Sequence, residues 1–310
     1  MKTSIIIGSR RSKLALIQAE SIVNQIRTIN HSLTITISRI TTQGDRDRRS
    51  QLNQIAREGI FVKELEEALL DGRIDIAVHS LKDMPAEITQ GLCLSAITER
   101  IDHRDVLVSR SSSLSLLAPG AKIGTGSTRR AIQLAAYRPD LRVCSIRGNI
   151  DTRLRKVYNE ELDGVIIAAA AMIRLGWEDK ISEYLPAEHF LPAVGQGALG
   201  IEIRSGDEEA AEIVSCVNHT TTQQSIMAER AFLLALGGGC RAPIAALGSV
   251  EGTKLKLEGM AADPEGKKIL HATEEGSAAM PEQAGILLAR KLLEMGASEF
   301  ITELKANEAR

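Results

Sequence analysis

Short β-branched runs alternate with helical repeats over the first part of the chain. Residues 5–7 are three consecutive isoleucines, typical of a buried strand, and apolar residues then recur at helical spacing from 14 to 26. Residues 34–40 alternate between apolar and polar like a second strand, and 74–78 form a third apolar run. Strands that alternate with helices favour an α/β architecture.

The same pattern begins again near residue 100. Further strands are predicted at 122–123, 141–146, 165–168 and 201–203, and helical patterns separate the first three. We expect Asp151 or Thr152 to cap the helix that follows the strand at 141–146. The last part of the chain differs. A helix at 224–236, alternating strands joined by a turn at 263–266, and a final amphipathic helix at 282–295 predict a small α+β domain.

Composition argues against two classes of protein, those that bind nucleic acid and those that span a membrane. The 310 residues carry a net charge of −2 and only 3% are aromatic, which argues against a nucleic-acid binder. The longest apolar stretch, 164–173, falls well short of the ~20 residues that a membrane span needs. The four cysteines, at 93, 144, 216 and 240, show no paired spacing, so we expect reduced thiols and a cytoplasmic protein.

Three turns of one design carry the strongest chemical signal. Glycine, hydroxyl residues and arginines stand between a predicted strand and a predicted helix at 8–12 and at 124–130, and Arg147 and Arg153 flank a third such turn. A helix N-terminus favours an anion, and guanidinium groups suit carboxylate or phosphate. Any single arginine of this kind is more often a solvated surface residue. Three such turns at the carboxyl ends of strands predict an anion-binding cleft.

Two further residues stand out as candidates for chemistry. Asp83 follows a predicted buried strand, where a carboxylate could hold a cation or could equally be an ordinary ion-paired group beside Lys82. Cys240 follows three glycines, a setting that presents a thiol in a tight loop and beside Arg241 favours the thiolate. A flexible linker with an incidental thiol is the alternative. His79 fits a structural role, and no metal site is predicted.

The sequence GxGxxG at 195–200 does not indicate a dinucleotide site. That motif needs a strand before it and a helix after it. Here Pro192 precedes it and the predicted strand 201–203 follows, so the segment is interpreted as a hinge loop.

Together these segments resemble the porphobilinogen deaminase family. The matching stretches include GSRRSKLAL, GIFVKELEEAL, DIAVHSLKDMPAEI, IGTGSTRR, IRGNIDTRL, LPAVGQGALGIE and AERAFL followed by LGGGC, in the family's order from residue 8 to about 243. The resemblance implies two periplasmic-binding-protein-like α/β domains with a cleft between them, plus a small C-terminal α+β domain. It divides the chain into 1–98 with 195–217, 99–194, and 218–310.

The resemblance also implies an activity, hydroxymethylbilane synthase. The family joins four porphobilinogen molecules head to tail with loss of ammonia, on a dipyrromethane cofactor linked to a cysteine that corresponds to Cys240. Asp83 corresponds to the essential aspartate. Residues matching cofactor contacts are Lys82, Ser80, Thr125, Ser127, Arg129, Arg130, Arg147 and Arg153. Residues matching substrate contacts are Arg10, Arg11, Arg174 and Gln196. A cytoplasmic monomer without nucleic-acid or membrane partners is implied.

Two rival functions and some departures accompany this interpretation. A non-catalytic anion-binding protein would use the same arginine turns but leaves the Cys240 loop unexplained. A cysteine-nucleophile acyl transferase would need a base near Cys240, and His219 is its sequence neighbour. Glu58 stands where the family usually has lysine, and Gly126 where it usually has serine.

Overall fold

The first unit of the fold is a five-stranded sheet of order β2-β1-β3-β10-β4. The computed structural model describes residues 2–42, 62–110, 113–237 and 243–301. β1 pairs in parallel with β2 and β3, whereas β10 pairs antiparallel with β3 and β4. The strands span Ser4–Arg10 (β1), Thr34–Ile40 (β2), Ile76–Ser80 (β3), Leu92–Ile97 (β4) and Leu199–Arg204 (β10). The helices are α1 (Lys13–Ile29), α3 (Lys63–Leu70) and α7 (Glu208–Ser215).

A second five-stranded sheet, of order β7-β6-β8-β5-β9, repeats this design. β6 is parallel to β7 and β8, and β5 is antiparallel to β8 and β9. The strands span Asp105–Ser109 (β5), Lys122–Thr125 (β6), Arg142–Ser145 (β7), Gly164–Ala168 (β8) and Glu183–Tyr184 (β9). The helices are α4 (Thr128–Tyr137), α5 (Ile150–Tyr158) and α6 (Ala169–Leu175), and short 3-10 turns span Leu114–Leu116 (η2) and Glu178–Lys180 (η3).

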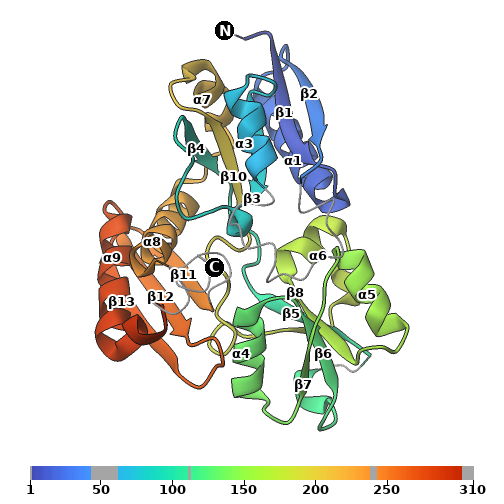
Figure 1. The fold of residues 1–310 in the computed structure, drawn as a ribbon. Helices are drawn as coiled ribbons and strands as arrows, with labels where there is room; N and C mark the ends of the chain where they lie inside the picture. The colour runs from blue at the N-terminus through green and yellow to red at the C-terminus, as the bar shows by residue number, and fades with distance from the viewer. Residues whose placement is uncertain (1, 43–61, 111–112, 238–242, 302–310) are drawn as a thin grey trace.

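The chain crosses between these two units twice. β5 follows β4 of the first sheet, and β10 returns to lie between β3 and β4 after the second sheet is complete. Each sheet therefore has four strands that run in one direction and one antiparallel strand that a crossover brings in between two of them. Figure 1 shows the first unit at the top and the second at the lower right. α1 packs against α6 where the two units meet.

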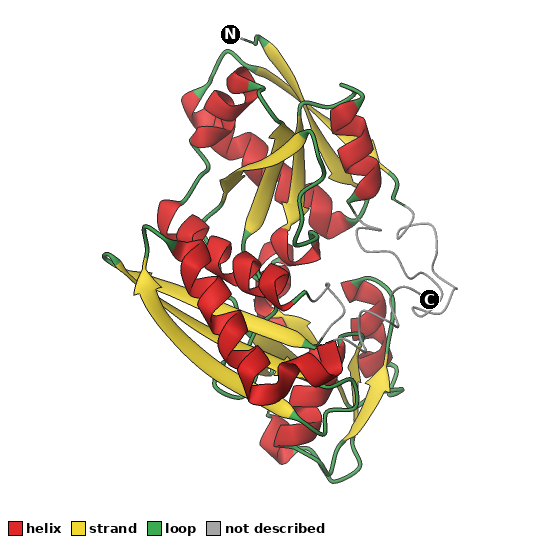
Figure 2. Cartoon of the chain, turned by 60° about the vertical axis from the view of Figure 1, so that its left-hand side comes forward, coloured by secondary structure: helices red, strands yellow, loops and turns green. Residues whose placement is uncertain are grey.

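The C-terminal unit is a three-stranded antiparallel sheet covered on one face by helices (Figure 2). Its strands are β11 (Ile244–Glu251), β12 (Lys254–Ala262) and β13 (Ile269–Ser277), and its helices are α8 (Thr220–Leu236) and α9 (Pro281–Leu292). Phe232 of α8 and Leu288 of α9 are fully buried against Leu257 of β12. The predicted architecture of two α/β units and a small α+β unit is confirmed.

Helix ends differ in places from the sequence-based expectation. The predicted cap of α5 was wrong: Asn149, not Asp151 or Thr152, is the N-cap, and its side chain accepts the backbone N–H of Thr152 at 3.0 Å. The final helix ends at Leu292 and continues as a π-helical turn, Leu293–Ala297 (η4). Within the described parts of the chain, no helix is long and apolar enough to cross a bilayer.

Candidate active site

The three arginine-bearing turns lie at the carboxyl ends of strands, as predicted. β1 ends at Arg10, β6 at Thr125 and β7 at Ser145, and each is followed within a few residues by a helix. A side chain caps every one of these helices. Ser12 accepts the backbone N–H of Ala15 at 3.2 Å, and Ser127 accepts that of Arg130 at 3.4 Å. These hydroxyls therefore hold the turns in place by satisfying helix N-termini.

Arg129 and Arg130 enter the protein interior and share one carboxylate, that of Asp105. Arg129 Nη2 lies 2.9 Å from Asp105 Oδ2, and Arg130 Nη2 lies 2.7 Å from Oδ1. Arg129 also donates to the carbonyl of Leu191, and Arg130 to that of Ile166. Burial alone would raise the pKa of the Asp105 carboxyl, but the charges of the two arginines hold it well below its ordinary value. Arg130 Nε is buried and has no hydrogen-bond partner within the described ranges.

Gln196 joins this cluster to the first unit. Its amide nitrogen donates to Asp105 Oδ1 at 2.7 Å and to the carbonyl of His103 at 2.8 Å. Its amide oxygen accepts from Arg130 Nη2 and, at 3.2 Å, from Lys82 Nζ. Burial lowers the pKa of Lys82 to about 8, and the charge of Arg130 acts in the same direction. One glutamine thus links a lysine after β3 to the arginines of α4.

Asp83 lies in a single 3-10 turn, Leu81–Asp83 (η1), directly after β3. Its side chain is half-buried, and its carboxylate has no hydrogen-bond partner among the residues that the structure describes. The negative charge of Asp83 acts on Lys82 and on Arg153, two cations from different units of the fold. The carboxylate therefore lies within electrostatic range of two cations and is able to accept hydrogen bonds from a ligand.

The remaining predicted site residues lie around the same strand ends. Arg153 donates from Nε to the carbonyl of Gly148, and Arg174 donates to that of Gly197. Burial lowers the pKa of both arginines, to about 10 for Arg174. Arg10 and Arg147 are half-buried, whereas Arg11 is exposed.

Two residues near the turn that carries Asp83 have structural partners. Ser80, at the end of β3, exchanges hydrogen bonds with the amide of Gln18 on α1. His79 is buried and lies 3.1 Å from Glu202 on β10, so the expected structural role of this histidine is confirmed. The pair connects neighbouring strands beneath the turn that carries Asp83.

Cys240 and the loop around it, residues 238–242, lie outside the described residues. α8 ends at Leu236, and Gly237 adopts the left-handed conformation, with φ of 71°, that glycine tolerates best. His219 caps the opposite end of this helix, where its Nδ1 contacts the hydroxyl of Thr222 at 2.8 Å. A 17-residue helix is about 25 Å long. His219 is therefore distant from the start of the Cys240 loop, which disfavours the acyl-transferase alternative.

Asp105 was not identified from the sequence as a site residue. Asp105 is the first residue of a buried strand, and its partners come from a turn more than twenty positions away, so no local pattern marks it. Charge balance could have indicated such a residue, because two adjacent arginines that enter the protein interior need a carboxylate partner.

Comparison with known proteins decides the family. A family model described as porphobilinogen deaminase, dipyromethane cofactor binding domain, matches residues 5–212, and a model of the porphobilinogen deaminase C-terminal domain matches residues 223–294. The chain is 44% identical to the porphobilinogen deaminase of Pelotomaculum thermopropionicum over 100% of both chains. It is 48% identical to that of Alkaliphilus metalliredigens, over 96% of this chain and 95% of the relative.

The chain belongs to the porphobilinogen deaminase family. Its enzyme class is that of a transferase, hydroxymethylbilane synthase, and the family's cofactor is dipyrromethane. Among solved structures, a putative methionine-binding lipoprotein from Bacillus subtilis resembles it at 14% identity and a TM-score of 0.42, over 69% of this chain and 90% of that one. That likeness is too distant to assign a ligand.

Proposed function

We propose that Asp83 is the catalytic residue of a hydroxymethylbilane synthase and that Cys240 carries its dipyrromethane. The activity is the stepwise condensation of four porphobilinogen molecules with loss of ammonia, in tetrapyrrole biosynthesis. One observation supports the residue assignments above others. Asp83 accepts no hydrogen bond from the described residues, and it lies within electrostatic range of cations from both α/β units.

The residues present fit a dipyrromethane. Such a group carries several carboxylates, and Lys82, Arg153 and Arg174 are half-buried cations whose pKa values are all lowered by burial. Buried positive charge of this kind favours an anionic ligand. The orphan Nε of Arg130 points to the same need. When bound, the group would supply a nucleophilic pyrrole carbon that starts the chain.

The polar residues of the site fall into two groups, one assigned to the cofactor and one to the substrate. We assign Lys82, Ser80, Thr125, Ser127, Arg129, Arg130, Arg147 and Arg153 to the cofactor, and Arg10, Arg11, Arg174 and Gln196 to substrate. Arg129 acts through Asp105 and not by direct contact, since its guanidinium already donates to Asp105 and Leu191 and is 5% exposed. Arg153 and Lys82 flank Asp83 and would orient incoming carboxylates.

Asp83 would act on the substrate during loss of ammonia. Its oxygens can accept hydrogen bonds from pyrrole N–H groups, and its charge offsets the positive charge that the substrate carbon gains as the amine leaves. After the new carbon–carbon bond forms, the same carboxylate can take up the proton that the attacked pyrrole carbon loses.

Peptide mapping tests the cofactor assignment. Active protein is digested with trypsin, and the mass of the fragment containing Cys240 is measured by mass spectrometry. We expect this fragment to carry the added mass of two pyrrole units, and Cys240→Ser to lack any thioether adduct. An unmodified Cys240 fragment from fully active protein would refute the assignment.

Substitution of Asp83 tests the catalytic assignment separately. We expect Asp83→Asn to lower kcat by roughly 10²–10⁴-fold, because it removes charge and proton acceptance but little volume. The Cys240 adduct, measured by intact mass, should remain. Near-normal turnover in Asp83→Asn would exclude this residue from the mechanism.

We also propose the three-domain division 1–98 with 195–217, 99–194, and 218–310, and a cytoplasmic monomer that binds no nucleic acid. The two crossovers and the separate three-stranded sheet support the division. Cys93, Cys144 and Cys216 are free thiols, which suits a reducing compartment.

A further inference from the structure

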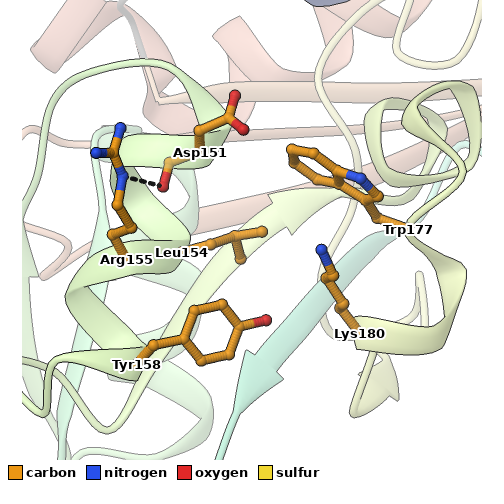
Figure 3. Close-up of a pocket in the computed structure, with 6 residues that line it drawn as sticks. All are labelled: Asp151, Leu154, Arg155, Tyr158, Trp177 and Lys180. Carbon is orange, nitrogen blue, oxygen red and sulfur yellow. Dashed lines mark hydrogen bonds between the residues drawn. The ribbon is translucent and has the colours of Figure 1, made fainter.

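A pocket outside the candidate active site lies between α5 and the turn that follows α6. It has a volume of about 230 Å³ and is lined by Asp151, Leu154, Arg155, Tyr158, Trp177 and Lys180 (Figure 3). The lining combines two aromatic rings, one aliphatic side chain, one carboxylate and two cations. Such a set suits a small aromatic ligand that carries charges of both signs.

The charged groups of this pocket are not neutralised by one another. Asp151, Arg155 and Lys180 form no ion pair with any residue in the described ranges, and Arg155 donates only to the backbone oxygen of Asp151 at 3.5 Å. Elsewhere on the same helix, Lys156 pairs with Glu161 at 2.8 Å. The unpaired charges of the pocket are therefore available to a ligand.

Trp177 connects the pocket to the first arginine turn. Lys180 Nζ lies 4.4 Å from the centre of the Trp177 ring, and Lys13 Nζ lies 5.0 Å from it. Lys13 is the first residue of α1 and follows directly after the turn at 8–12. α5 also carries Arg153, one of the cations near Asp83. The pocket thus borders two of the turns assigned to anion binding.

We propose that this pocket is a docking site for a second molecule of porphobilinogen, a proposal that rests on the proposed function. The substrate is a pyrrole with an acetate, a propionate and an aminomethyl group. Its ring would contact Trp177 and Tyr158, and its two carboxylates would pair with Arg155 and Lys180. The aminomethyl ammonium would pair with Asp151. No bond forms or breaks here, and the site holds the next substrate beside the catalytic turns.

The chain's single tryptophan makes the pocket directly observable. The purified holoenzyme is titrated with the pyrrole diacid that lacks the aminomethyl group and so cannot react, and Trp177 fluorescence is followed. We expect a saturable change whose half-saturation concentration rises about threefold to tenfold in Lys180→Met. Lys156→Met, on the same helix but outside the pocket, should leave it unchanged. No saturable change, or equal half-saturation in both variants, overturns the proposal.

Substitution of Asp151 tests the proposal independently. In an Asp83→Asn background, which consumes substrate far more slowly than the wild type, porphobilinogen should bind this pocket about threefold more tightly than the diacid. Asp151→Asn should abolish that difference. An undiminished difference would contradict the ammonium assignment. Failure of the proposed function would look different, because the wild-type protein would then form no linear tetrapyrrole and carry no pyrrole adduct on Cys240.

Discussion

Lys82 and Asp83 are neighbours in sequence, yet their charged side chains have different surroundings. Burial disfavours the charged form of Lys82, the charge of Arg130 acts in the same direction, and the carboxylate of Asp83 opposes both. The Lys82 ammonium donates to a neutral amide, that of Gln196. Asp83 lies within electrostatic range of Lys82 and Arg153. At the residue scale, the charged form of Lys82 is therefore unfavourable, and a polyanionic ligand would stabilise it. The carboxylate of Asp83 is available to accept hydrogen bonds from a ligand.

This arrangement predicts how stability depends on pH. Below about pH 8 Lys82 is protonated in both folded and unfolded protein, so the burial penalty is present in full. Between pH 8 and the ordinary lysine value of 10.5, the unfolded chain retains a proton that the folded protein has lost, so stability rises with pH. Since Lys82 keeps some exposed surface, we expect a gain of about 2 kcal/mol in protein without dipyrromethane.

Urea unfolding at several pH values between 7.5 and 10.5 measures this gain. Lys82→Met should be more stable than the wild type at the lower end of that range, and the difference should shrink as the pH rises. Lys82→Arg serves as the control, because a guanidinium stays charged throughout. A constant difference between wild type and Lys82→Met would contradict the prediction.

The sequence predicted where the arginine turns lie better than it predicted which residues each arginine contacts. Arg129 and Arg130 look like equivalent ligands for a carboxylate in the sequence. In the structure both are bound by Asp105, and only Arg130 also reaches Gln196. Spacing along the chain defines the turn that carries an arginine, but its partner depends on how separate strands assemble, which no local pattern reports.

At the scale of elements, the turn between β7 and α5 shows how a cap positions cations. Asn149 Oδ1 accepts both the backbone N–H and the hydroxyl of Thr152. The carbonyl of Gly148, whose φ is 102°, accepts from Arg153. The cap and the arginine contact therefore belong to one turn, and loosening the cap would free the arginine.

We predict that Asn149→Ala lowers the free energy of unfolding by about 1 kcal/mol, because the first turn of α5 loses its side-chain acceptor. Asn149→Asp should retain most of the stability, since a carboxylate also caps and is favoured at a helix N-terminus. Thermal unfolding of the three proteins measures the effect. Equal losses in both variants would show that the side-chain acceptor does not stabilise the turn.

Element positions were largely predictable, and element ends were not. The strand expected at 34–40 is β2 with the same bounds, because its alternation is strong. The helix expected from 224 begins at Thr220 instead, since three threonines hid its start and a histidine, an unusual N-cap, precedes them. The left-handed Gly296 lies directly after the expected final helix, and its φ of 103° accompanies the π-helical turn.

At the scale of the whole molecule, one buried carboxylate joins the three units. Glu229 of α8 accepts from Arg100 in the first crossover, from the backbone N–H of Gly195 in the second at 2.7 Å, and from that of Gly248 in β11 at 2.8 Å. Its side chain is fully buried. Both crossovers are therefore tied to the unit that bears Cys240, so the angle between the two α/β units depends on α8.

Glu229→Gln should consequently weaken the molecule as a whole. The amide cannot accept from all three donors, and it leaves the Arg100 guanidinium buried without its counter-charge, so we expect a loss of about 3 kcal/mol in urea unfolding. The double variant Arg100→Gln, Glu229→Gln should lose less than the sum of the single losses, because the unpaired charge is gone. Glu67→Gln, in the exposed Lys63–Glu67 pair, should change little. Strict additivity would mean that the two side chains stabilise the crossovers independently, and the coupling of the units through Glu229 would have to be abandoned.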